Sequence, residues 1–422
     1  MDRKVAKNLL LISFAAETFF ATYGLVLGSD ASVASILYLI AGLGLVFSIL
    51  FLPEARLEAG MKSEPGSVWI KVGLTAGMLL LAYITSRYWF NEIFVDPDYA
   101  DMLPVIKVMN ERFLSGHWKQ VYDPIQDIWS GMMPGYLPAM WLPYSGALWL
   151  NLDMRWMTVL TILLSFGGFL FILRIKKKAF STYLLTGIAG MLFWWIFSKD
   201  DIHGVISLSE EGPVILYYVL LCFAIVSGNI YFISLAVSLC LLSRYSMIGW
   251  VIPFLMFLAS RKAFRQMLVF TLTGLFIFLM FFLIPFGTKP VWQLFHLPAS
   301  YVPFASRVWT ATPEVFWLNL GLAKFFGPQR TVILHQVLIL GSFGVPVLFM
   351  LICLLQKKRK LNNVLLATLK LSLVLFYQFI DVPYGYLFYT STFVSLVITV
   401  ILLSQDHKRE EEKDHSPDSS IQ

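Results

Sequence analysis

Apolar residues fill most of this sequence in long runs that only short polar segments interrupt. Most runs are about 16–25 residues long, which is the length that an α-helix needs to cross the hydrocarbon core of a bilayer. A helix on the surface of a soluble protein would show a polar face every few residues, and these runs do not. The pattern predicts about twelve membrane-spanning helices near 8–28, 33–53, 69–89, 156–173, 182–198, 212–227, 229–246, 247–259, 267–285, 331–355, 363–380 and 384–404.

Two parts of this pattern allow a second interpretation. The 229–259 block fits either one helical hairpin or a re-entrant element. The first run follows Met1-Asp2-Arg3-Lys4 and superficially resembles a signal peptide. More spans follow at once and no convincing small-residue cleavage site is present, so we expect this run to be a retained first helix.

The composition agrees with a membrane protein. Hydrophobic residues make up 58% of the chain and charged residues 14%, and the mean hydropathy is +0.72. A soluble domain carries roughly 25% charged residues, so this chain has too little polar surface to cover a water-soluble globule. We therefore predict an all-α polytopic membrane protein, with residues 1–404 as one multi-spanning domain.

The basic residues predict the topology of this domain. The net charge is +6 and the pI about 9.0, but the cations form short clusters between apolar runs, which favours a bilayer rather than nucleic acid as the partner. All the clusters fall on one side, which we expect to be cytoplasmic together with both termini. These clusters are Arg3, Lys4 and Lys7; Arg56, Lys62 and Lys71; Arg174, Lys176, Lys177 and Lys178; Arg261, Lys262 and Arg265; and Lys357, Lys358, Arg359 and Lys360.

This predicted topology leaves two long segments on the other side of the membrane, 90–154 and 286–330. It requires the apolar stretch 134–151, which contains Pro134, Pro138 and Pro143, to bend at the interface without crossing. Both segments are rich in Trp, Tyr, Phe and Pro, which is typical of interfacial helices. Loops of this length usually carry function. The charged tail, 405–422, is expected to be disordered cytoplasmic sequence.

The first long segment opens with three carboxylates in Asp96-Pro97-Asp98-Tyr99-Ala100-Asp101. One interpretation is a solvated turn in which an Asp caps the next helix. The other is a general base that removes a proton from a substrate hydroxyl. A carboxylate shielded by aromatic residues at the interface can have its proton affinity raised by partial burial.

The order of motifs in this segment resembles a known enzyme class. After Asp98-Tyr99 come a helix ending in Phe113-Leu114-Ser115-Gly116, then Tyr122-Asp123-Pro124, then Tyr136-Leu137-Pro138 and a Pro-broken apolar helix. This order resembles the first extracytoplasmic loop of the C-type integral membrane glycosyltransferase superfamily, in particular the family 87 mannosyltransferase-like proteins. Two departures are that Tyr136-Leu137-Pro138 stands where those proteins have Tyr-Pro-Pro, and that more helices precede the loop here than in many members, which have one.

The resemblance implies a function and a set of residues. The implied donor is a polyprenyl-phosphate sugar, with mannose the expected hexose, and the implied acceptor is a hydroxyl of a glycolipid or glycan. The acidic base of the loop corresponds to Asp98, Asp96 or Asp101, and Asp98 is favoured by its place before Tyr99. The resemblance implies a metal-independent reaction, and we expect no metal and no cofactor.

The leaving phosphate of such a donor needs a cation or N–H donors beside it. Arg244 follows an apolar run and matches a basic residue that the family places after a comparable helix; its alternative role is an interfacial Arg that reaches lipid headgroups. The resemblance also implies a phosphate contact from His296 or Arg307 in the second long segment, where a structural interfacial role is the alternative. Arg155 would bind phosphate or simply pair with Asp153.

The remaining polar residues suggest no further site. We interpret Lys199, Asp200, Asp201, Glu210 and Glu211 as a solvated loop, and His203 and His335 have no assigned role. Metal-ligand spacings such as His-Glu-x-x-His or Cys-x-x-Cys are absent from the sequence, and all three cysteines fall in apolar runs.

Three functions are considered for this sequence. The leading hypothesis is an inverting membrane glycosyltransferase in the cell (inner) membrane with an extracytoplasmic site. The alternative is a transporter or flippase of a lipid-linked sugar, which predicts ionisable residues at mid-membrane and internal repeats. Glu17 is the main such residue, and no clear repeat is visible. A structural partner in an envelope complex has no positive feature in its favour.

Overall fold

A computed structural model describes residues 1–22, 31–55, 65–97, 100–128, 131–173, 180–199, 204–356 and 361–414. Within these ranges the chain forms helices and no β-strand, with one isolated bridge between Ile125 and Met132. The predicted all-α class is confirmed, since apolar runs satisfy their backbone groups inside each helix.

Nine helices in the described ranges are long and apolar enough to cross a membrane. They are α1 (Arg3–Thr22), α2 (Ser32–Ile49), α3 (Pro65–Glu92), α7 (Arg155–Ile172), α8 (Phe180–Ser198), the continuous α13 to α14 (Phe264–Phe286), the stretch through α17 (Thr331–Ile339) and α18 (Val345–Leu355), α19 (Leu361–Gln378) and the start of α20 (Phe388–Asp414). Three shorter apolar helices, α10 (Glu211–Ser227), α11 (Ile230–Leu241) and α12 (Ile248–Ser260), coincide with the other three predicted segments.

The helix predicted over 229–246 ends earlier than its apolar pattern suggests. The N–H of Ala139 donates to the carbonyl of Leu242 at 2.9 Å, and the hydroxyl of Ser243 donates to the carbonyl of Cys240 at 2.8 Å. These bonds end α11, and Arg244 follows in extended backbone with φ −144° and ψ 139°. The 229–259 block therefore forms two short helices, and Arg244 lies at the break between them.

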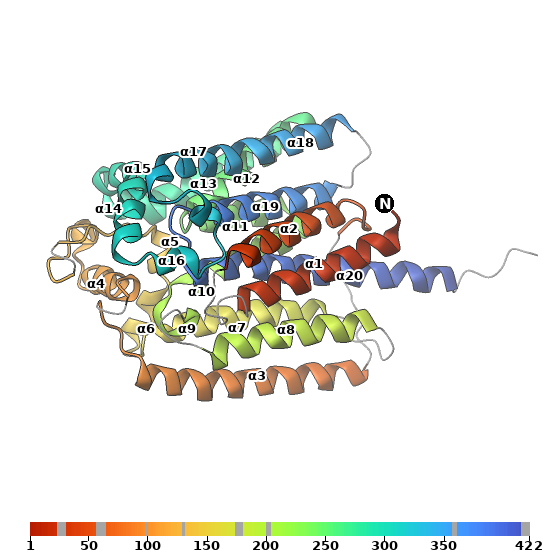
Figure 1. The fold of residues 1–422 in the computed structure, drawn as a ribbon, viewed down its shortest axis with the longest axis horizontal. Coiled ribbons are helices and arrows are strands. Elements are labelled where there is room, and N and C mark those ends of the chain that lie inside the picture. The colour runs from red at the N-terminus through yellow and green to blue at the C-terminus, as the bar shows by residue number, and fades with distance from the viewer. Residues whose placement is uncertain are drawn as a thin grey trace, which may run out of the picture.

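The two ends of the bundle differ in construction. Figure 1 shows the N-terminus, the end of α18 and the far end of α20 at one end. The opposite end carries α4 (Met102–Leu114), α6 (Tyr144–Trp149), α15 (Thr288–Ala311) and α16 (Glu314–Trp317) (Figure 1). Both long segments therefore gather at one end, away from the first basic cluster. Within 134–151, α5 (Pro138–Trp141) and α6 are too short to cross a bilayer, as the sequence analysis required.

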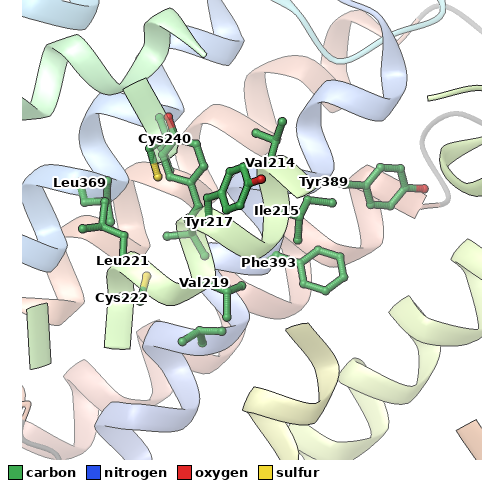
Figure 2. Close-up of a cluster of buried hydrophobic side chains, with 14 of the residues drawn as sticks. Val214, Ile215, Tyr217, Val219, Leu221, Cys222, Cys240, Leu369, Tyr389 and Phe393 are labelled. Carbon is green, nitrogen blue, oxygen red and sulfur yellow. The ribbon is translucent and has the colours of Figure 1, made fainter. Parts of the chain in front are cut away.

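Helix α10 forms the centre of the core. Figure 2 shows Val214, Ile215 and Val219 of this helix beside Tyr389 and Phe393 of α20. At its start, a Cβ on Gly212 would lie 2.7 Å from the Cα of Thr158 on α7, so only glycine allows this approach. The close packing fixes the position of the residues just before Gly212.

The C-terminal segment differs from the prediction. Helix α20 continues to Asp414, so the beginning of the segment that we expected to be a disordered tail from Gln405 on is helical. The buried part of α20 ends near Ser404, and the charged residues that follow extend the same helix. Helix propensity of Lys- and Glu-rich sequence explains this continuation.

Candidate functional site

Two consecutive glutamates and one arginine form a buried cluster at the end of the bundle that carries the short helices. The Arg244 guanidinium lies 2.8 Å from Glu210 Oε1 and also bonds to Glu211 Oε2. Glu210 is 1% exposed and Glu211 is fully buried. We call Glu210, Glu211 and Arg244 the carboxylate–arginine cluster. The interpretation of Glu210 and Glu211 as a solvated loop is therefore wrong.

Local structure positions both carboxylates. The N–H of Glu211 donates to the Ser209 hydroxyl at 3.2 Å, which orients the first turn of α10. The hydroxyl of Thr390 on α20 donates to Glu211 Oε1 at 2.7 Å. Glu211 thus has partners for both oxygens, whereas Glu210 has a partner for only one. Among the described residues, Glu210 Oε2 and Arg244 Nε are buried without a hydrogen-bond partner.

The charge balance of the cluster is unusual, because two carboxylates share one guanidinium. The pKa of Glu210 is raised to about 7, chiefly by burial, with an opposing effect from Arg244 and smaller increases from the Glu211 and Asp101 charges. A carboxyl group with a pKa near neutrality can either donate or accept a proton under physiological conditions. Glu210 therefore has the property of a general acid or base.

Asp101 is the aspartate of the first long segment that lies near this cluster. It occupies the N-cap position of α4 but makes no side-chain capping bond. Burial raises the pKa of Asp101, and its charge in turn raises the pKa of Glu210 and Tyr136. Asp101 and Glu210 are therefore close enough to influence each other, although 109 residues separate them in sequence (210 − 101).

Of the other two aspartates in the first long segment, Asp96 and Asp98, the structure describes only Asp96. Asp96 is partly buried, and its carbonyl accepts a hydrogen bond from the Ala100 N–H at 3.1 Å, which closes the turn. Asp98, the base favoured by the sequence, lies outside the described residues. His203 and Asp201 also lie outside them.

The charges of the cluster and of Asp101 act on two tyrosine side chains. Burial and then the charges of Asp101 and Glu210 raise the pKa of Tyr136, from the Tyr-Leu-Pro motif, and the charges of Arg244 and Glu210 also act on Tyr301 of α15, which is 38% exposed. The Tyr386 hydroxyl donates to the sulfur of Met102 at 2.8 Å, which joins the short 3₁₀ helix just before α20 to the start of α4. Aromatic rings with hydroxyl groups suit a site that binds sugar rings, because they offer both stacking surface and hydrogen bonds.

Arg155 takes the second of its two predicted roles. Its guanidinium pairs with Asp153, with Nη2 2.6 Å from Oδ2. It also donates to the carbonyls of Ile93 at 2.6 Å and Phe90 at 3.0 Å. These bonds join the end of α3 to the start of α7, and they leave little donor capacity for a phosphate.

His296 and Arg307 both lie on the exposed side of α15. His296 Nδ1 is 2.9 Å from the Trp292 carbonyl, and the Arg307 guanidinium lies over the ring of Phe304 at 5.9 Å. Neither contacts the carboxylate–arginine cluster in the described structure. This placement favours the alternative role of His296 and Arg307 as structural interfacial residues. Of the four predicted phosphate-binding cations, only Arg244 bonds to Glu210 and Glu211.

Two further buried ion pairs escaped the sequence analysis. Lys370 on α19 pairs with Glu17 on α1, and His335 on α17 pairs with Asp381 in the connection between α19 and α20. Lys370 interrupts an apolar run, and this could have singled it out beside Glu17. In the part of the chain that the structure describes, no group of three His, Cys, Asp or Glu side chains could hold a metal ion.

Comparisons with protein-family models, with curated proteins and with solved structures found no match for this chain.

Proposed function

We propose that this protein is a membrane glycosyltransferase that moves a hexose, mannose by the family resemblance, from a polyprenyl-phosphate donor to a hydroxyl of a glycolipid or glycan. The observation that carries the proposal is the buried carboxylate–arginine cluster, in which the Arg244 guanidinium lies 2.8 Å from Glu210 Oε1, with the charge of Asp101 acting on Glu210. It supplies a proton acceptor and a cation at the end of the bundle where both long segments gather.

The reaction needs one base and one leaving-group partner. A carboxylate, either Glu210 or an aspartate of the first long segment, accepts the proton of the acceptor hydroxyl. The freed oxygen electron pair forms a bond to the anomeric carbon from the face opposite the phosphate. The bond between the anomeric carbon and the phosphate oxygen breaks, and its electron pair leaves with the phosphate. The configuration of the sugar is therefore inverted.

Arg244 has a role in this scheme that depends on Glu210. Two ionised glutamates around one guanidinium give the cluster a net negative charge, which opposes an approaching phosphate. When Glu210 takes up the acceptor proton, it becomes neutral at the moment when negative charge develops on the leaving phosphate. The charge of Arg244 is then available for that phosphate.

Helix lengths support a site that is recessed from the membrane surface. We propose that the three shorter helices complete twelve crossings, with the basic clusters in the cytoplasm of the cell (inner) membrane. Helix α10 has 17 residues and α11 has 12, so they rise only about 25 and 18 Å against about 30 Å of hydrocarbon. The cluster lies just before α10 and just after α11, so it would lie at the membrane interface, within reach of a lipid-linked donor.

The test is a transfer assay with protein purified into nanodiscs. Labelled polyprenyl-phosphate mannose and a glycolipid mixture are supplied to wild type and to Asp101→Asn, Glu210→Gln, Asp96→Asn and Asp98→Asn. Loss of the base should slow transfer about 100-fold or more, whereas the exposed Asp127→Asn control should transfer as wild type. Equal transfer by all variants would disprove the assignment of the base. Absence of transfer by the wild type would disprove the glycosyltransferase activity.

One observation favours the alternative of a transporter or flippase. Glu17 and Lys370 form a fully buried ion pair between two membrane-spanning helices, which is a common feature of ion-coupled transport. Two results together would support transport instead. The protein would scramble a fluorescent lipid-linked sugar in proteoliposomes, and it would transfer no sugar to an acceptor.

A further inference from the structure

Helix α15 connects two stretches that are long and apolar enough to cross a membrane. Helix α14 ends at Phe286, Gly287 turns the chain with φ 83°, and α15 begins at the next residue. Near its other end, the Ser306 hydroxyl is 3.3 Å from the hydroxyl of Thr331, where α17 begins. Both attachments lie at the same end of the bundle (Figure 1). A helix held between two such points runs along the membrane surface and does not cross it.

The exposed surface of α15 is divided into an apolar and a polar stripe. Trp292 and Phe295 are 68% and 75% exposed, and their rings stack with centroids 6.2 Å apart. Lys289, Ser300 and Arg307 are also exposed and lie within about 20° of one another around the helix axis, at about 100° per residue. Phe295 lies about 140° from Ser300 on the same scale. This division is typical of a helix at the boundary between lipid and water.

The neighbours of α15 indicate the surroundings of each stripe. Lys289 pairs with Asp123 at 3.2 Å, so the polar stripe lies on the side of the first long segment. The helices that lead into α15 expose Phe276, Met280 and Ile284 at intervals of four residues, which is the pattern of a lipid-facing stripe. The apolar stripe of α15 begins only eight residues after the last of these (292 − 284), so the same lipid can cover both.

The buried side of α15 is attached to the residue that follows Arg244. Pro298 has no N–H, so it cannot donate to the carbonyl of Leu294 as a helix residue in that position normally does. The Tyr245 hydroxyl donates to this carbonyl at 2.7 Å instead. Leu294 directly precedes Phe295, so the apolar stripe is one residue away from a bond to the segment that carries Arg244.

We propose that α15 lies in the headgroup layer of the membrane at this end of the bundle, with Trp292 and Phe295 inserted among phospholipid acyl chains. The polar stripe of Lys289, Ser300 and Arg307 faces water and the first long segment. Aromatic rings are stable at this depth, where one side is apolar and the other is wet. Through Leu294, the lipid surface holds the segment of Arg244 in place. This binding does not depend on the proposed transfer reaction.

Fluorescence from single sites in nanodiscs tests the position of each stripe. Phe295→Cys and Trp292→Cys are labelled with a small environment-sensitive fluorophore in the full-length protein. The matched control is Ser300→Cys, which places the label on the polar stripe of the same helix. The three native cysteines are buried, so they contribute little label. The lipid quencher is phosphatidylcholine with a nitroxide at the top or at the end of an acyl chain, and iodide is the quencher in water.

We expect the nitroxide at the top of the chain to quench the label at positions 292 and 295 at least twofold more than the label at position 300. Iodide should show the opposite order, and each labelled variant should melt as the wild type does. Equal quenching by lipid at the three positions, or stronger quenching by the nitroxide at the chain end, would overturn the proposal. A label at position 295 that neither lipid nor iodide quenches would show that protein, such as a second copy of this chain, covers the stripe instead.

Discussion

The ammonium group of Lys370 lies 2.7 Å from Glu17 Oε1, and neither side chain is exposed. Lys370 also donates to the Ser391 hydroxyl at 2.7 Å, and the Ser395 hydroxyl donates to Glu17. The pair therefore joins α1 to α19 and α20, the first helix of the chain to the last two. In surroundings of low dielectric each charge depends on the other, because desolvation without a partner is costly.

Single substitutions of this pair should destabilise the protein more than the double substitution. Lys370→Met leaves an unpaired carboxylate and Glu17→Gln leaves an unpaired ammonium, each at a cost of roughly 3–5 kcal/mol. Glu17→Gln with Lys370→Met removes both charges and should recover most of the loss. Melting temperatures in nanodiscs measure the difference. A double variant that melts below both single variants would contradict the interpretation.

Glu210 should give a pH dependence with a defined sign. Burial raises its pKa from 4.5 to about 7, so the folded protein favours the protonated form. The stability from this group is fully present below about pH 4.5 and is lost as the pH rises through about 7. If ionised Glu210 is the base, the transfer rate should increase as the pH rises through about 7. Glu210→Gln should remove the inflection from both profiles, and Asp127→Asn should keep it.

Arg244 should be required for stability as well as for transfer. Arg244→Met leaves Glu210 and Glu211 adjacent, buried and without a cation, at a cost of roughly 3–5 kcal/mol. Arg244→Lys keeps the charge but loses the planar guanidinium, whose Nη2 bonds to both carboxylates and whose other nitrogens remain for a phosphate. We expect Arg244→Lys to retain most of the melting temperature and to lose transfer at least tenfold. Equal transfer by Arg244→Lys and wild type would exclude a role for the guanidinium geometry.

Substitution of Arg155 should destabilise the attachment of the end of α3 without weakening the binding of the donor. Arg155→Met removes the bonds to Ile93, Phe90 and Asp153, which should cost about 1–3 kcal/mol. The KM for polyprenyl-phosphate mannose should remain within about twofold of wild type, because the guanidinium is already occupied. A large rise in that KM at an unchanged melting temperature would restore the phosphate-binding role.

The proposed topology can be measured with single cysteines. His117→Cys, in the first long segment, should react with a membrane-impermeant maleimide from outside the cell, and Lys262→Cys should react only after permeabilisation. Both positions are exposed. The three native cysteines are buried, so they provide a low background. Reaction of position 117 from the cytoplasm alone would reverse the orientation.

The sequence by itself determined the helices of the membrane domain and the end at which each long segment lies. Hydropathy is a local property, and a run of apolar residues must form a helix in lipid wherever the run stands in the chain. The same reasoning predicted that 134–151 does not cross, and this stretch forms only the short helices α5 and α6, which begin at or next to prolines. Local rules also identified Arg244 as an ionisable residue beside an apolar run.

Only the tertiary structure decided which charges are buried together. Glu210 and Glu211 precede an apolar helix, and acidic residues at a helix start are as common in solvated loops as in sites. They form a buried cluster because Gly212 lets α10 approach α7 and because α11 ends at Leu241, which brings Arg244 within 2.8 Å of Glu210. Such a contact joins residues 34 apart and depends on packing that no local pattern encodes. The pairing of His335 with Asp381 was decided in the same way.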